Sequence, residues 1–472
     1  MDAQAQAEQL AELVTLNHSG RYRELLQAAQ PTPTSADGLF LAANAHYALE
    51  DLPEAWRLAH EILSIEPKHT AALTLLASIA NLRGQSNLAR ELLESLDSLG
   101  PDLPEARLEM TQVLIAEGKF TQAIELINAS EVLFNQPGWR ARMHLLLGDA
   151  YDGIGQYQEA YENYSKKNQY VAERAKQLGI EDGLLQWGQR LLKEFTATKN
   201  EWKKLENAST TVTPQPIFIV GFPRSGTTLL QAKLEHLPEI SALEERELWQ
   251  DSLHRWFSQF ENWYPLLAAQ SADIAWAQDC YWQRVHQHLG SAPSKFFVDK
   301  FPMNVLVLPL IAKVFPGAHI IYCTREPMAC IFSAFRRFIK PNSLSLACGS
   351  LANGWKLFNV IQEFMKVAID SLPLQFHQLH YDDWMQDPDG EFARLVARLG
   401  LGSARQPTLA QWNDSLGRRP RSTPSTAQLT GGISDQFRDQ YLNYRFSWQA
   451  LCTSNATSNG QTNLGDTTIR NR

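Results

Sequence analysis

The sequence has few cysteines, and none lies in its first half. Five cysteines occur in 472 residues: Cys280, Cys323, Cys330, Cys348 and Cys452. Their positions contain no CxxC spacing, so they indicate neither a zinc ribbon nor a disulfide framework. We expect ordinary buried thiols and no bound metal.

Long apolar runs and an excess of positive charge are also missing. The longest apolar run, Val305–Ile311, is far shorter than a membrane span, and the start MDAQAQAEQL has no basic or apolar leader region. We therefore expect a cytoplasmic protein without a membrane anchor. The formal net charge of −8 argues against a nucleic-acid-binding protein that is basic throughout. A hydrophobic share of 44% is typical of a globular chain, and 472 residues predict two or three domains.

A 34-residue repeat fills the first part of the chain. Three alanines recur at this step: Ala55, Ala89 and Ala123. Gly84 lies five residues before Ala89, and Gly118 lies five residues before Ala123. This period, with a small residue at a helix crossing and a glycine turn, resembles the tetratricopeptide repeat. We expect four repeats from about residue 36 to residue 175 and a degenerate one around residues 20–31. An irregular helical domain is the alternative.

The charge divides the chain in the same place. Residues 1–180 hold 14 Lys+Arg and 24 Asp+Glu, which gives −10, and the remainder carries +2. We expect residues 1–180 to form the repeat domain and to bind a protein or peptide partner. A polar linker at 181–213, an α/β domain at 214–452 and a disordered tail at 453–472, rich in Ser, Thr and Asn, should follow.

The expected α/β domain alternates short apolar runs with longer helical stretches. The runs are Ile217–Val220, Phe296–Val298, His319–Cys323 and Phe376–Tyr381. Continuous apolar strands separated by helices predict a parallel sheet with helices on both faces. The fold class is therefore a multidomain chain, with an all-α repeat solenoid followed by a P-loop-like α/β domain.

The first apolar run leads into a candidate phosphate-binding loop, GFPRSGTTLL. Free backbone N–H groups and a helix dipole converge on an anion in such a strand, loop and helix. The candidate contacts are Arg224, Ser225, Gly226, Thr227 and Thr228. Because Thr227 occupies the position of the lysine in the template GxxxxGK[ST], the loop argues against ATP hydrolysis or phosphoryl transfer. A tight glycine turn is the structural alternative.

A second candidate anion motif follows the run His319–Cys323. Arg325 follows this run after Thr324, and Ser333, Arg336 and Arg337 share one face of the helix that Pro327 begins. Arginines with a hydroxyl predict a clamp for a second phosphate. A solvated basic helix face is the alternative.

Together the two motifs resemble the sulfotransferase superfamily, in particular the tyrosylprotein sulfotransferases, over Ile217–Gly402. The resemblance implies 3′-phosphoadenosine 5′-phosphosulfate (PAPS) as the donor, with its 5′ phosphosulfate in the loop. It also implies that Arg325, Ser333 and Arg337 bind the 3′ phosphate and that Tyr381 contacts the nucleotide. A packing role is the alternative for Tyr381.

The same resemblance implies the residues of the transfer step. Glu245 matches the base, Lys300 and Arg224 match the cations that stabilise the transferring group, and Ser425 matches a late serine that contacts it. The alternative for Glu245 is a favourable acid in a helix's first turn. The alternative for Ser425 is a residue of a plain surface loop. A rival interpretation makes Asp299 a metal-binding acid of a phosphoryl-transfer enzyme.

The sequence therefore predicts an enzyme, a repeat-bearing sulfotransferase that acts on an acceptor hydroxyl, with a protein tyrosine as one candidate acceptor. Neither a nucleic acid nor a membrane is an expected partner. Two alternatives remain open. The first is a P-loop phosphoryl-transfer enzyme. The second is a repeat-based interaction protein with a degenerate catalytic domain, suggested by Gly431 and Gly432 after the late loop.

Overall fold

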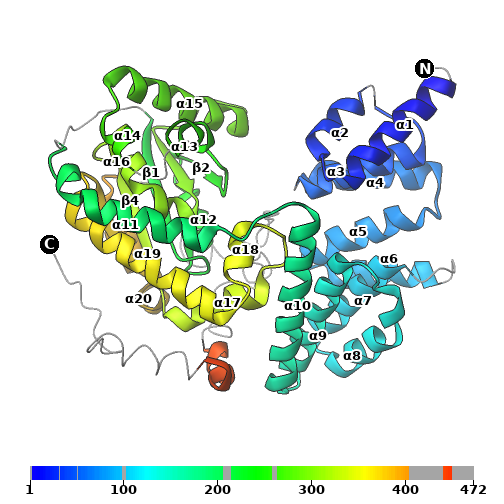
Figure 1. The fold of residues 1–472 in the computed structure, drawn as a ribbon. Coiled ribbons are helices and arrows are strands. Elements are labelled where there is room, and N and C mark those ends of the chain that lie inside the picture. Colours follow the sequence, from blue (N-terminus) through cyan, green and yellow to red (C-terminus); the bar gives the residue numbers. More distant parts are fainter. Residues whose placement is uncertain are drawn as a thin grey trace. The chain divides into compact units, whose positions relative to one another are not determined.

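The computed structural model describes residues 3–30, 32–49, 51–97, 103–205, 214–257, 263–402 and 439–448 (Figure 1). The chain folds into two compact units. The first is made mainly of Met1–Gln177, and the second mainly of Leu178–Gln231 and Leu237–Gly402. None of the helices in these ranges is both long and apolar enough to cross a bilayer.

Helical hairpins build the first unit. Its helices are α1 (Ala3–His18), α2 (Tyr22–Ala28), α3 (Ala36–Ala48), α4 (Leu52–Ile65), α5 (Thr70–Leu82), α6 (Ser86–Asp97), α7 (Pro104–Ala116), α8 (Phe120–Ala129), the 3₁₀ turn η1 (Glu131–Leu133), α9 (Pro137–Gly153) and α10 (Tyr157–Gln177). Each odd-numbered helix packs on the next one, which gives four hairpins after α1 and α2 (Figure 1). The predicted repeat solenoid is confirmed.

Small residues allow the helices of a hairpin to approach closely. The repeated alanines are completely buried: Ala55, Ala89, Ala123 and Ala160. In the last hairpin a Cβ on Gly148 would lie 2.4 Å from the ring of Tyr164, so only glycine fits there. Glycines at left-handed backbone angles close the hairpin turns: Gly84, Gly118 and Gly155, at φ of 70° to 77°. The 34-residue spacing thus reflects helix packing.

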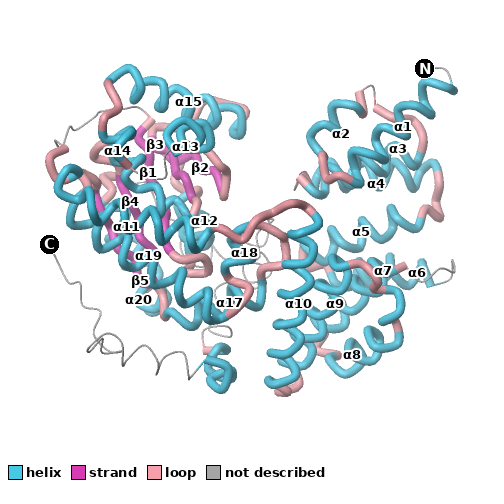
Figure 2. Tube along the Cα trace, in the orientation of Figure 1, coloured by secondary structure: helices cyan, strands magenta, loops and turns pink. Residues whose placement is uncertain are grey.

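A five-stranded parallel sheet forms the centre of the second unit (Figure 2). Its strands are β1 (Gln215–Gly221), β2 (Ile240–Glu244), β3 (Phe296–Lys300), β4 (His319–Thr324) and β5 (Gln375–His380). They lie in the order β2-β3-β1-β4-β5, and every neighbouring pair is parallel. The predicted α/β fold class is confirmed, although β2 was not among the four expected strands.

Helices connect and flank these strands. They are α11 (Leu184–Trp202), α12 (Thr227–Leu234), α13 (Gln250–Phe257), α14 (Tyr264–Leu267), α15 (Ser271–Leu289), η2 (Pro302–Val307), α16 (Leu308–Val314), α17 (Pro327–Arg337), α18 (Ser343–Ala347), α19 (Leu351–Ser371), α20 (Tyr381–Gln386), α21 (Pro388–Arg398) and the 3₁₀ turn η4 (Gln440–Tyr444). Many are short, and the long pair α11 and α19 pack together.

Helix α11 lies inside the segment that the sequence analysis assigned to a linker. Its apolar residues recur at helical spacing and are buried: Leu185, Leu191, Phe195 and Trp202. The ring of Phe195 lies 4.9 Å from the ring of Phe364 on α19, centroid to centroid. Residues 184–202 are therefore part of the second unit. The expected tail at 453–472 lies outside the described residues.

Candidate functional site

The candidate residues gather at the carboxyl edge of the sheet. Each strand is followed or ended by one of them: Arg224 after β1, Glu245 after β2, Lys300 in β3, Arg325 after β4 and Tyr381 after β5. Because all strands are parallel, their carboxyl ends meet at one edge. In open parallel sheets this edge is where ligands bind. The fold thus collects residues that are far apart in sequence.

The loop between β1 and α12 has the backbone of an anion-binding loop. Arg224 and Gly226 have left-handed φ angles of 71° and 94°, a conformation that L side chains rarely adopt. The turn directs the first N–H groups of α12 towards the loop. Ser225 is only 3% exposed, and within the described part of the chain its Oγ has no hydrogen-bond partner. A buried hydroxyl without a partner suits a ligand that supplies an acceptor oxygen.

Three arginines lie close together beside this loop. Nε of Arg224 donates to Oγ of Ser333 at 3.0 Å, and Nη1 of Arg325 donates to the carbonyl oxygen of Arg224 at 3.4 Å. Loss of hydration, followed by the positive charges of Arg337 and Arg325, lowers the pKa of Arg224 to about 10. A lowered arginine pKa indicates a positive potential, which a bound anion would relieve.

The ring of Tyr381 joins the loop to this group of arginines. Cζ of Arg325 lies 4.3 Å from the ring centroid of Tyr381, which is within the range of a cation–π contact. A Cβ placed on Gly226 would come within 2.7 Å of the same Tyr381 ring. The glycine is therefore required by close packing as well as by its backbone angle.

Lys300 is the centre of a second group of contacts. Its side chain is completely buried, and its Nζ lies 2.7 Å from Oε1 of Glu245, 2.9 Å from Oε1 of Glu244 and 3.2 Å from Oγ1 of Thr228. Thr228 belongs to α12, so the lysine connects the phosphate loop with the end of β2. Two carboxylates and a hydroxyl surround the ammonium, which satisfies the requirement that a buried charge be paired.

Glu245 reaches Lys300 through an unusual backbone conformation. Its φ is 50°, in the left-handed region, and its N–H donates to the carbonyl oxygen of Lys300 at 2.8 Å. Consecutive residues of a regular strand point to opposite faces. The turn at Glu245 instead brings the carboxylates of Glu244 and Glu245 to the same Nζ. Strained backbone of this kind concentrates at functional sites.

Asp299 lies on the opposite face of the sheet from Lys300. The two are neighbours in β3, so their side chains alternate. Asp299 accepts a hydrogen bond from the hydroxyl of Tyr281 at 3.3 Å, and burial raises its pKa to about 7. Within the described ranges, His, Cys, Asp and Glu side chains form no cluster of three suited to a metal ion. Asp299 is thus separated from the residues at the carboxyl edge.

Sequence reasoning found most of this group and missed part of it. The structure brings together Arg224, Ser225, Gly226, Thr228, Lys300, Glu245, Arg325, Ser333, Arg337 and Tyr381, and Thr227 begins α12 beside them. The contacts of Glu244 and Thr228 with Lys300 were not predicted. The signal for Glu244 was its place at the end of β2, a strand that the pattern did not reveal. Ser425 lies outside the described residues.

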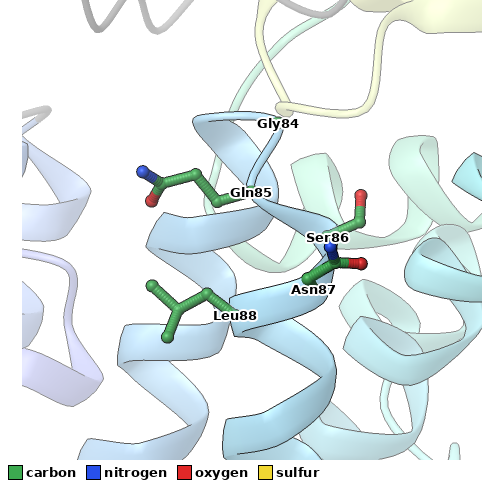
Figure 3. A pocket seen from close by; sticks show the side chains of 5 residues that line it. All are labelled: Gly84, Gln85, Ser86, Asn87 and Leu88. Carbon is green, nitrogen blue, oxygen red and sulfur yellow. The ribbon is translucent and has the colours of Figure 1, made fainter.

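The first unit has a surface hollow of a different character. It lies at the turn between α5 and α6 and is lined by Gly84, Gln85, Ser86, Asn87 and Leu88 (Figure 3). None of these side chains ionises near neutral pH, so the hollow lacks the groups that acid–base chemistry needs. The carboxyl edge of the sheet remains the candidate active site.

Comparisons with known proteins agree with the motifs. Residues 216–404 match the Sulfotransferase family.

The chain is 25% identical over 432 residues to an uncharacterized protein of Aquifex aeolicus, covering 84% of this chain and 54% of that protein. It is 25% identical over 185 residues to Protein-tyrosine sulfotransferase 1 of Danio rerio, covering 36% of this chain and 50% of that protein. The chain thus spans about half the length of these two curated relatives. The predicted resemblance to sulfotransferases is confirmed.

A solved structure also matches. The sulfotransferase domain from the curacin biosynthetic pathway is 16% identical, with a TM-score of 0.32, and the match covers 51% of this chain and 98% of that domain.

Proposed function

We propose, from the premise that residues 216–404 form a sulfotransferase-family domain, that this protein transfers a sulfonate group from PAPS to an acceptor hydroxyl. One observation carries the proposal: the arginines around the β1 loop and the pair of Lys300 with Glu245 lie at the same sheet edge. The first group suits a nucleotide with several anionic groups, and the second suits proton transfer beside a leaving phosphate.

The donor would be held by the loop and by the arginines. The first N–H groups of α12, the hydroxyl of Ser225 and the guanidinium of Arg224 would receive the 5′ phosphosulfate. Arg325, Ser333 and Arg337 would receive the 3′ phosphate. The pKa of Arg224, lowered to about 10 by lost hydration and by Arg337 and Arg325, supports this assignment, since bound anions stabilise clustered positive charge.

Glu245 and Lys300 would carry out the transfer step. The Glu245 carboxylate takes the proton from the acceptor hydroxyl as the acceptor oxygen forms its bond to sulfur. The bond between sulfur and the bridging oxygen breaks, and its electron pair stays on the 5′ phosphate. The ammonium of Lys300 and the guanidinium of Arg224 stabilise that developing charge. The products are a sulfated acceptor and adenosine 3′,5′-bisphosphate.

A phosphoryl-transfer enzyme has less support. Thr227 occupies the position of the lysine that reaches the β and γ phosphates in P-loop enzymes. The strand-end acid Asp299, which would have to hold a magnesium ion, accepts a hydrogen bond from Tyr281 on the opposite face from Lys300. Both features favour sulfonate transfer over phosphoryl transfer.

We propose a phenolic hydroxyl, such as a peptide tyrosine, as the first acceptor to test. The support is the name of the Danio rerio relative, together with the repeat unit, since helical solenoids commonly present surfaces to peptides. The net charge of −10 in residues 1–180 favours acceptor segments that are neutral or basic.

The test is a transfer assay with the full chain. Labelled PAPS is incubated with tyrosine peptides, phenols and glycans, and products are detected by mass spectrometry. Glu245→Gln should lower kcat by about 10² to 10⁴-fold, while the affinity for adenosine 3′,5′-bisphosphate, measured by calorimetry, stays within about threefold. The control is Glu239→Gln, which removes a carboxylate from the residue just before β2, at the end of the strand away from Glu244, and should keep full activity. Phosphoryl transfer from ATP–Mg²⁺ with no use of PAPS would contradict the proposal.

A further inference from the structure

We infer that Glu244 is a positioning residue, which holds the Lys300 ammonium in place while Glu245 turns to the acceptor. The inference rests on the proposed sulfonate transfer. It concerns a carboxylate to which neither the loop motif nor the resemblance gives a role. Three observations support it: the strand register, the hydrogen bonds of the lysine and the different exposure of the two acids.

The register of the sheet places Glu244 directly beside Lys300. The two residues are paired in the parallel ladder of β2 and β3, so their side chains lie on the same face. Oε1 of Glu244 lies 2.9 Å from Nζ of Lys300. The contact joins residues 56 positions apart in the sequence. It is fixed by the backbone hydrogen bonds between β2 and β3 and does not depend on a loop conformation.

The hydrogen bonds of Lys300 show why one carboxylate is insufficient. An ammonium group has three N–H donors, and Glu245, Glu244 and Thr228 supply three acceptors. In the proposed reaction Glu245 must also accept a proton from the acceptor hydroxyl. If Glu245 were the sole carboxylate beside Lys300, its uptake of the proton would leave the buried ammonium with the donor phosphate as its single counter-ion, and that phosphate must leave with the product. Glu244 removes this conflict.

Glu244 and Glu245 differ in side-chain exposure and in backbone conformation, as expected if one holds Lys300 and the other meets the acceptor. The side chain of Glu245 is 42% exposed and follows a left-handed backbone turn, whereas that of Glu244 is 19% exposed and belongs to the strand. Glu245 can therefore meet an acceptor that arrives from solvent. Glu244 is held by the ladder and stays with Lys300 and Thr228 throughout the reaction.

The experiment separates Glu244 from a general structural effect by three variants. Glu244→Gln keeps the side-chain shape and removes the charge, and Glu244→Asp restores the charge on a shorter side chain. We expect Glu244→Gln to lower kcat by about 30-fold while KM for PAPS changes less than about threefold, and Glu244→Asp to recover most of the loss. Because Glu244 acts through Lys300, adding Glu244→Gln to Lys300→Ala should lower kcat no further.

The outcomes distinguish this inference from the proposed function. Folding of each variant is checked by circular dichroism and thermal unfolding. Glu239→Gln again serves as the control for loss of one carboxylate, here from the residue just before β2. A near-normal kcat in Glu244→Gln, or an equal loss of kcat in the Lys300→Ala background, would overturn the positioning role and leave sulfonate transfer intact. Failure of the unmodified protein to transfer sulfonate from PAPS to any acceptor would overturn both.

Discussion

Nε of Arg224 donates a hydrogen bond to Oγ of Ser333, although the two residues are 109 positions apart in the sequence. Arg224 belongs to the loop after β1, and Ser333 belongs to α17 after β4. In the proposed function they bind different phosphates of the same nucleotide. The hydrogen bond therefore connects the two anion motifs, and we expect their contributions to donor binding to be coupled.

The first prediction concerns this coupling. Ser333→Ala removes the acceptor of the Arg224 hydrogen bond, and we expect it to weaken the binding of adenosine 3′,5′-bisphosphate by about tenfold, which corresponds to about 1.4 kcal/mol. Arg224→Lys, which loses the planar fork, should cost as much or more. In the double variant the losses should be less than additive when measured by calorimetry.

A buried serine elsewhere in the second unit supplies the control. The hydroxyl of Ser371 donates to Val367 O within its own helix, so Ser371→Ala should leave nucleotide affinity unchanged. Fully additive losses for Ser333→Ala and Arg224→Lys would show that the two motifs act independently.

The second prediction concerns the contact between Gly226 and Tyr381. In Gly226→Ala the new methyl group would meet the Tyr381 ring at 2.7 Å, at a φ of 94°. We expect the ring to be displaced from Arg325 and nucleotide affinity to fall by more than tenfold, about 1.4 kcal/mol or more. Gly84→Ala is the matched control, because Gly84 also has a positive φ but has nothing within 4 Å of its Cβ position. It should lower the thermal midpoint slightly and leave nucleotide binding unchanged.

The sequence allowed those parts of the fold to be predicted that depend on local pattern. The 34-residue step of Ala55, Ala89 and Ala123 follows from helix packing, and continuous apolar runs mark the buried strands β1, β3 and β4. The residues at the ends of these strands were recognised for the same reason. Arg224 and Arg325 lie within four residues after the ends of apolar runs, where a parallel sheet places its binding groups.

The parts that sequence reasoning missed depend on tertiary contacts. Strand β2 is short and mostly half-buried, so it has no continuous apolar run. Without β2 the pairing of Glu244 with Lys300 could not be foreseen, nor could the left-handed turn at Glu245. Helix α11 fell inside the predicted linker because the 34-residue step ends before it and a polar segment with two prolines, residues 200–216, begins near its end. Its buried residues pack against α19, about 170 residues later in the chain.

The third prediction concerns the packing of the last hairpin in the first unit. Gly148→Ala would place a methyl group 2.4 Å from the Tyr164 ring, and we expect a loss of about 1 to 3 kcal/mol in the free energy of unfolding. Gly138→Ala, in the same helix α9 and with nothing within 4 Å, should instead stabilise the unit by up to about 1 kcal/mol. Urea unfolding followed by circular dichroism measures both. Equal effects of the two substitutions would show that the close crossing is not a constraint.

The fourth prediction follows from the buried carboxyl of Asp299. Burial raises the pKa of Asp299 from its ordinary value of 3.8 to about 7. Between about pH 4 and pH 7 the unfolded state therefore loses its proton while the folded state keeps it, so stability from this group falls as the pH rises and is constant above pH 7. Relative to the unmodified protein, Asp299→Asn should gain up to about 4 kcal/mol in the free energy of unfolding across this interval, measured by denaturant unfolding at several pH values.

The control is Asp279→Asn, which replaces an exposed acid on the same helix as Tyr281 and should follow the unmodified protein. A constant difference between Asp299→Asn and the unmodified protein from pH 4 to pH 7 would mean that Asp299 is already ionised in the folded state across this interval, which would contradict the prediction.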